Sequence, residues 1–230
     1  MINFNVKNVK HSKNSASWYN EMLSMLAEDM IAPLIGIEPT NSRHPIGTRI
    51  RPFLTWYFNE GVTDWNSNSN SYSYKYAFGA YLARNYGGAK LIKNILANDS
   101  IDIDSISSAL NQTAGIDFNY AVEKFAEALI FSDPTVGRAT FNKTVTDTID
   151  GTTYTFTGFD IWSARYNLTV PAGSYYSWGG PTVYSLWNQP TMRPYSVYLQ
   201  SYDDWKTGAK SSVTLNKPVA TGVKLYLMIR

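Results

Sequence analysis

The pattern of apolar and polar positions changes near residue 134 of this 230-residue chain. Before that point apolar residues recur every three or four positions, which is the period of an amphipathic helix. After it Thr, Tyr, Val and Gly dominate, and apolar residues alternate with polar ones as they do in strands. The pattern predicts an α+β protein, with a mainly helical lobe over residues 1–134 and an all-β sandwich over residues 135–230.

Capping residues mark the ends of the predicted helices. Ser15 or Ser17 can cap the first helix, and Pro33 ends it. Asp104 and Asp117 can cap the last two, and a Gly-Gly pair stops an earlier one. The predicted helices cover residues 17–32, 73–86, 89–97, 104–110 and 118–131; residues 33–48 and 59–71 are expected to be loops, with a short apolar segment at 51–58 between them.

The second part of the chain carries the signals of strands and turns. Asp150-Gly151 is a typical hairpin turn, and the alternation that follows it from residue 152 fits a strand. Further strands are expected near residues 197–199, 212–215 and 223–229. Glycine, proline and asparagine separate these segments, which is the spacing of a small sandwich.

The first predicted helix has an apolar side and a polar side. Glu21, Ser24 and Glu28 fall together, opposite a stripe that includes Trp18 and Leu26. Such a row is typical of the solvent face of an amphipathic helix. A carboxylate on a packed helix is also a zinc ligand in many metal sites, because the ligand must be deprotonated and rigidly placed. The spacing alone leaves both interpretations open.

Composition excludes several classes of function. The formal charge is only +2 and no basic block occurs, so the chain has no signature of nucleic-acid binding or of attachment to a membrane surface. The absence of cysteine excludes disulfides and thiol chemistry. The sequence shows no signal peptide and no transmembrane run.

The two histidines do not form a metal site on their own. His11 and His44 lie far apart, without the spacing that places two histidines on one helix face. Both are expected to be solvent-exposed loop residues, although either could serve as an acid or an oxyanion donor. The aspartates between Asp99 and Asp104 lack the glycine and the distal glutamate of a calcium loop, so they are interpreted as a helix-capping loop.

Two segments resemble a family of zinc peptidases. Residues 18–24, Trp-Tyr-Asn-Glu-Met-Leu-Ser, resemble the W-x-N-E-G-x-A/S signature that carries the zinc glutamate of aminopeptidase-like and thermolysin-like metallopeptidases. Met1-Ile-Asn-Phe is similar to the segment just after H-E-x-x-H in the hyicolysin family of bacterial secreted metallopeptidases, within the gluzincin type. Residues 74–88, with a Tyr-x-x-Gly-Ala core and a Gly-Gly break, are also similar. The resemblance covers roughly residues 1–133.

The resemblance implies a site for zinc and for a peptide or protein substrate. Glu21 would be the third zinc ligand, and Asn20, Glu28 and Asp29 would lie in the second shell around the metal. Tyr76 would donate a hydrogen bond to the oxyanion of the tetrahedral intermediate, with Tyr72, Tyr74 and Tyr81 as nearby alternatives. The resemblance also implies an extracellular or cell-envelope location.

The sequence departs from that family at its centre, because it contains no H-E-x-x-H. The expectation is therefore the downstream part of a metallopeptidase, cut or mis-started just after its catalytic helix. Zinc is expected in the full-length parent, and neither tight zinc binding nor peptidase activity is expected of this chain alone. An exposed apolar surface around Met1, Ile2 and Phe4 could favour association.

A second interpretation needs no catalysis. The chain could be a binding or adhesion protein that contacts a glycan or a protein through its aromatic-rich sandwich. Trp162, Trp178, Trp187 and Trp205 would then line a platform, although such tryptophans more often fill a core. The coding DNA upstream of Met1 separates the two interpretations, because only the enzyme requires an in-frame H-E-x-x-H there.

Overall fold

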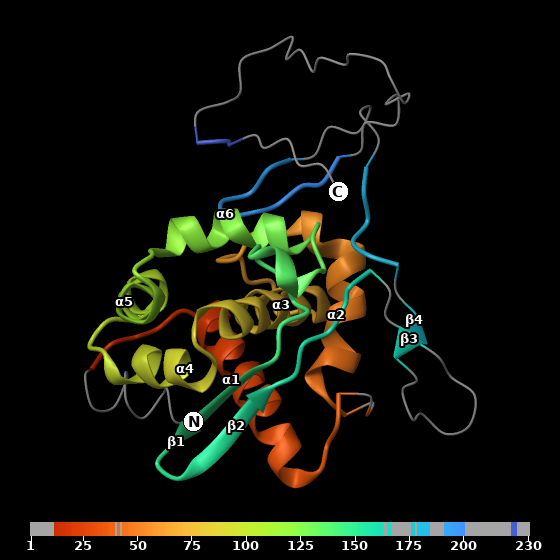
Figure 1. The fold of residues 1–230 in the computed structure, drawn as a ribbon. Helices are drawn as coiled ribbons and strands as arrows, with labels where there is room; N and C mark the ends of the chain where they lie inside the picture. Colours follow the sequence, from red (N-terminus) through yellow and green to blue (C-terminus); the bar gives the residue numbers. More distant parts are fainter. Residues whose placement is uncertain are drawn as a thin grey trace.

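The structure is a computed structural model, and it describes residues 12–39, 41, 43–162, 165–166, 176–177, 179–184, 191–200 and 222–224. Helices dominate the described part, with α3 at the centre and the other helices around it (Figure 1). The helices are α1 (Ser17–Ile31), α2 (Pro45–Trp56), α3 (Ser69–Tyr86), α4 (Gly88–Ala97), α5 (Asp102–Ala114) and α6 (Phe118–Ala128), with short 3-10 turns η2 (Ala32–Ile35), η3 (Tyr57–Asn59) and η4 (Pro134–Val136). The strands are β1 (Val145–Ile149), β2 (Thr152–Phe156), β3 (Arg165–Tyr166) and β4 (Tyr176–Ser177).

The helices predicted before residue 134 are present, and most of their ends follow the expected chemistry. The Asp117 side chain accepts a hydrogen bond from the Tyr120 N–H at 2.8 Å, and Gly87 ends α3 with a left-handed φ of 113°. The expected Asp104 cap is wrong, because α5 begins at Asp102 and Asp104 lies within its first turn. The expected serine cap of α1 is also wrong. Ala16 occupies that position without a side-chain cap, and its N–H donates instead to Asp102 at the start of α5. A contact from a distant element therefore replaces the local cap.

Helix α2 was not predicted, because its first turns fall in the expected loop over residues 33–48. The His44 side chain caps it, with Nδ1 accepting from the Ile46 N–H at 3.1 Å, and Pro45 opens its first turn. Histidine is not among the usual capping residues. Pro52 also lies inside the helix, where proline ordinarily indicates a break.

The core is built around α3. Every residue of α3 from Ser73 to Arg84 is buried, and the helix packs against α1 and α2. Gly79 allows the closest approach, since a Cβ there would stand only 2.9 Å from side-chain atoms of Met22 and Leu26 on α1. Aromatic rings of α2, α3, α6 and the segment after α6 fill the remaining space, among them Phe53, Phe78, Tyr81, Phe118, Phe125 and Phe141.

The all-β sandwich predicted for residues 135–230 is wrong. The described residues there form the antiparallel hairpin β1-β2, the two-residue pair β3-β4 and one isolated bridge between Tyr184 and Gln200. The hairpin and its Asp150-Gly151 turn are confirmed, but the hairpin packs on α1 and α4 (Figure 1). Its apolar residues, such as Phe156, enter the helical core and not the inner face of a second sheet.

The other predicted strands have different outcomes. Val197 and Leu199 are buried against the helical core without forming a strand. The segment 212–215 and most of 223–229 lie outside the described residues. The predicted α+β class is therefore wrong for the part of the chain that the structure describes, which is mostly helical with small two-stranded pairings. The boundary at residue 134 stays a prediction.

Candidate functional site

Helix α1 carries most of the residues that the sequence singles out, and it divides them between two faces. Glu28 is exposed and Glu21 partly exposed, whereas Asp29 retains only 1% of its surface. A helix turns by about 100° per residue, which places Glu21, Ser24 and Glu28 on one side and turns Asp29 inward. The predicted polar face is confirmed, and Asp29 does not belong to it.

The Glu21 carboxylate has no hydrogen bond or ion pair with any residue that the structure describes. Its neighbour Asn20 is held in place, because Asn20 Oδ1 accepts from Ser15 Oγ at 2.8 Å and its Nδ2 donates to the Ser15 carbonyl at 3.3 Å. Glu21 is therefore a carboxylate on a well-anchored helix start that leaves its oxygens available to a ligand.

Asp29 is the centre of a buried group that we call the Asp29 cluster: Asp29, His44, Tyr76 and Arg84. Arg84 Nη1 lies 2.9 Å from Asp29 Oδ2, and Nη2 lies 3.3 Å from Oδ1. The Tyr76 hydroxyl donates to Oδ2 at 3.0 Å. All members are at most 1% exposed. The cluster joins α1, α2 and α3 through one carboxylate.

Arg84 extends the cluster to the hairpin. Its Nε donates to the Thr157 carbonyl at 3.0 Å, and its guanidinium lies 4.9 Å from the centre of the Phe159 ring. Nη1 also donates to the Ala80 carbonyl at 3.1 Å. A buried guanidinium is tolerable only with such partners, because desolvation of an unpaired charge is costly. The cluster thus ties α1 to the segment after β2.

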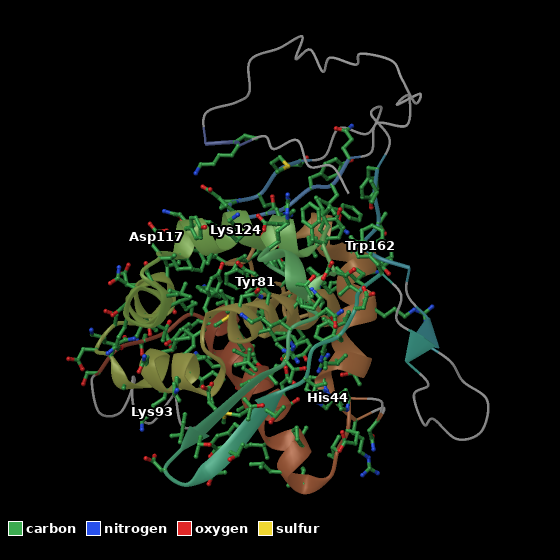
Figure 2. The ribbon with its side chains drawn as sticks, in the orientation of Figure 1. His44, Tyr81, Lys93, Asp117, Lys124 and Trp162 are labelled. Atoms are coloured by element: carbon green, nitrogen blue, oxygen red, sulfur yellow. The ribbon has the colours of Figure 1, made fainter. Side chains whose placement is uncertain are left out.

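His44, labelled in Figure 2, lies at the start of α2. Its Nε2 lies 3.6 Å from Asp29 Oδ1. Since Nδ1 accepts a backbone hydrogen bond, the proton of the neutral ring lies on Nε2. Burial lowers the pKa of His44; Asp29 opposes that effect and Arg84 adds to it. The expected exposure of His44 is wrong, because this side chain caps a helix and closes a buried cluster. His11 lies outside the described residues.

Tyr76 is fully buried, and its hydroxyl is engaged by Asp29. Burial raises the pKa of Tyr76 well above its ordinary value, and the Asp29 charge adds to this, so the phenol keeps its proton. Glu21 and Asp29 are separated by about 12 Å along the helix axis. The structure therefore brings Tyr76 to Asp29 and not to the Glu21 turn of α1.

A second buried ion pair joins α3 to the segment after η3, and no sequence motif predicts it. Lys75 Nζ lies 3.1 Å from Glu60 Oε2 and donates to the Gly61 carbonyl at 2.9 Å. Glu60 Oε1 accepts from Ser71 at 2.7 Å and from Asn66 at 3.2 Å. Burial lowers the pKa of Lys75, and Glu60 opposes this. The one available signal was a lysine within an otherwise buried helix.

Zinc is the metal that the resemblance implies, and the residues present fit part of such a site. A catalytic zinc takes three protein ligands, and Glu21 has the chemistry and availability of one. Within the described ranges, no group of three His, Asp or Glu side chains is arranged to hold a metal ion. Any histidine ligands must therefore come from outside these residues.

Comparisons of the chain with protein-family models, with curated proteins and with solved structures returned no match. None of the helices in the described part of the chain combines the length and apolar character needed to cross a bilayer.

Proposed function

We propose that Glu21 is the carboxylate zinc ligand of a secreted zinc-dependent peptidase whose two histidine ligands and general-base glutamate lie outside this sequence. One observation carries the proposal: a carboxylate without a partner among the described residues stands on a helix that is fixed from its other face by the Asp29 cluster. A metal ligand needs that combination of availability and rigidity.

The chain's own residues would have distinct parts in such a site. Glu21 would bind the metal, and zinc, when bound, polarises the scissile carbonyl of a peptide substrate and lowers the pKa of its water. Asn20 would fix the backbone turn that carries Glu21, through its two hydrogen bonds to Ser15. Glu28 lies on the same helix face and is free to orient a neighbouring ligand.

Asp29 and Tyr76 lie away from Glu21 and would act by holding helix α1 in place. Asp29 would hold α1 in register through Arg84, so that the Glu21 carboxylate keeps its direction. The oxyanion role of Tyr76 stays a prediction, and it would require the hydroxyl to exchange Asp29 for the substrate. Its established contact favours a positioning role.

The alternative function, binding or adhesion through an aromatic β-sandwich, lacks that sandwich in the described residues. It required a β-sandwich bearing a tryptophan platform, and that part of the chain shows none. The indole N–H of Trp162, labelled in Figure 2, donates to the Leu129 carbonyl at 3.1 Å, so this tryptophan has a structural contact with the end of α6. The other three tryptophans of the proposed platform lie outside the described residues.

The test begins with the reading frame upstream of Met1. If that frame encodes H-E-x-x-H, the extended protein should hold zinc and hydrolyse an unstructured protein such as casein, and a chelator should abolish the hydrolysis. The 230-residue chain alone should bind zinc only weakly, because it supplies one ligand of three. An upstream frame without H-E-x-x-H, or tight zinc binding by the chain alone, would contradict the proposal.

A further inference from the structure

A cavity of about 450 Å³ opens beside the first turn of α1. It lies where α1, the segment after η3 and the start of α5 meet. Its lining combines one aromatic, two apolar and three polar side chains: Trp18, Ile101, Ile103, Thr63, Asp102 and Asp104. We call it the Trp18 pocket. None of its residues belongs to the Asp29 cluster.

Trp18 forms a rigid wall of this pocket and brings an unused donor to it. The side chain is only 5% exposed, and its ring packs edge-on against Tyr19, with centroids 5.9 Å apart. Its indole N–H donates to no acceptor among the described residues, and it is not among their fully buried unpaired atoms, so it reaches solvent. An indole N–H at the edge of a buried ring is available to donate to a bound molecule. A bound molecule with an acceptor, such as a peptide carbonyl, would provide a partner.

Another part of the lining is acidic. Asp102 and Asp104 lie in the first turn of α5, where the helix dipole favours their charged forms. Asp102 Oδ1 accepts a hydrogen bond from the Ala16 N–H at 2.8 Å, and Oδ2 can still accept hydrogen bonds from a ligand. Neither carboxylate forms an ion pair with any described residue. Burial raises the pKa of Asp102, and nearby Asp104 adds to this while the Ala16 bond opposes it. A cation placed between the two carboxylates would relieve their repulsion.

The lining suits a side chain that has an apolar stem and a positively charged end. Ile101 and Ile103 offer apolar surface for methylene groups, and the two carboxylates offer acceptors for the charged end. An anion would meet like charges, and a purely apolar group would leave both carboxylates and the indole N–H unmatched. We propose that the Trp18 pocket binds the basic side chain of a peptide, lysine or arginine.

Its position gives the pocket a place in the peptidase. Trp18 and Glu21 are three residues apart on one helix, so their Cβ atoms are about 5–6 Å apart. A peptide held across a metal at Glu21 would reach the pocket with the side chain of a neighbouring residue. The pocket is then the specificity subsite of the function proposed above, and this part of the inference depends on that function.

The binding itself can be tested on the chain as it stands. The probes are Nα-acetyl-arginine amide and its uncharged isostere Nα-acetyl-citrulline amide. The indole N–H signal of Trp18, assigned by its loss in Trp18→Phe, should shift saturably with the arginine probe. The citrulline probe should bind at least tenfold more weakly. Equal shifts with both probes would overturn the proposal, because charge would then have no role.

Three Asp→Asn variants test whether the pocket carboxylates provide the negative charge that binds the arginine probe. Asp104→Asn should weaken the arginine probe at least fivefold, and so should Asp102→Asn, which keeps an acceptor for the Ala16 N–H. Asp150→Asn removes an exposed carboxylate at the hairpin turn and should leave binding unchanged. Asp104 is exposed, so its replacement should not unfold the chain. Unchanged binding in both pocket variants would overturn the proposal.

Failure of the pocket and failure of the peptidase give different results. Glu21→Ala should leave arginine binding intact, since Glu21 does not line the pocket. In the upstream-extended protein, Asp104→Asn should lower kcat/KM for an arginine-containing peptide toward that of its citrulline counterpart. Arginine binding without zinc in the extended protein would overturn the peptidase and the subsite, but not the pocket. Zinc-dependent hydrolysis without preference for the basic peptide would overturn the subsite alone.

Discussion

The two carboxylates Glu21 and Asp29 lie two turns apart on helix α1 and have opposite surroundings. Asp29 is buried and accepts from Arg84 and Tyr76, so its oxygens are satisfied within the fold. Glu21 is partly exposed and has no partner among the described residues. The comparison separates a carboxylate that holds the fold together from one that is available to a ligand, on the same element. The following predictions test this separation, from the largest effect to the smallest.

Replacement of Asp29 should destabilise the protein most. Asp29→Ala leaves the Arg84 guanidinium buried without its counter-charge, which costs about 3–5 kcal/mol of unfolding free energy. Urea denaturation of the variant and the parent measures the loss. Glu28→Ala, one residue earlier on the exposed face, is the control and should change stability by less than about 0.5 kcal/mol. Similar stabilities for the two variants would contradict the assignment of Asp29 as the anchor.

Loss of Lys75 should have a smaller effect of the same kind. Lys75→Met leaves the Glu60 carboxylate buried, but Ser71 and Asn66 still donate to it, so the expected loss is about 3 kcal/mol. The double variant Glu60→Gln, Lys75→Met should recover part of this loss, because no unpaired charge remains. A double variant as unstable as Lys75→Met would contradict an electrostatic cause.

His44 should make stability depend on pH. Its pKa in the fold lies below the ordinary 6.5, so the folded protein prefers the neutral ring. Its contribution is then complete above about pH 6.5 and is lost as the pH falls toward the folded pKa, with a slope no steeper than about 1.4 kcal/mol per pH unit. The charged groups that act on the ring are Asp29, whose Oδ1 lies 3.6 Å from Nε2, and Arg84, both within the cluster.

Urea denaturation between pH 7.5 and pH 5 measures this dependence. His44→Gln should reduce it, because glutamine does not titrate. A steeper loss of stability in the variant than in the parent would show that other groups dominate in this range.

Replacement of Glu21 should have the smallest effect on the fold. Glu21→Gln removes a charge that has no described partner, so the unfolding free energy should change by less than about 0.5 kcal/mol. Thermal denaturation measures this directly. A loss above about 1 kcal/mol would identify Glu21 as another structural carboxylate and would weaken its assignment as a ligand.

Sequence patterns were sufficient for the elements that depend on local chemistry. The amphipathic stripe of α1, the Asp117 cap and the Asp150-Gly151 turn each depend on neighbouring residues, and all three are present. Helix α2 was not predicted, because its cap is a histidine and Pro52 lies within it. The sandwich was inferred from alternation, which records that one side of a strand is buried but not which element buries it.

The site was only partly accessible from the sequence for a related reason. Glu21 and Asp29 were singled out together. Helical periodicity separates their faces, but the sequence could not show which residues would surround Asp29. Arg84 and Lys75 were overlooked because the carboxylates that pair with them are distant in the chain, and no local pattern reports such a pairing. The Trp18 pocket likewise combines residues of three separate segments.

The most direct test of the central claim is the zinc content of the upstream-extended protein in three forms: parent, Glu21→Ala and Glu38→Ala, which removes an exposed carboxylate outside α1. Metal analysis after gel filtration should give about one zinc per chain in the parent and in Glu38→Ala, and almost none in Glu21→Ala, with all three equally folded by circular dichroism. Zinc retained in Glu21→Ala, or lost equally from both variants, would contradict the assignment of Glu21 as the metal ligand.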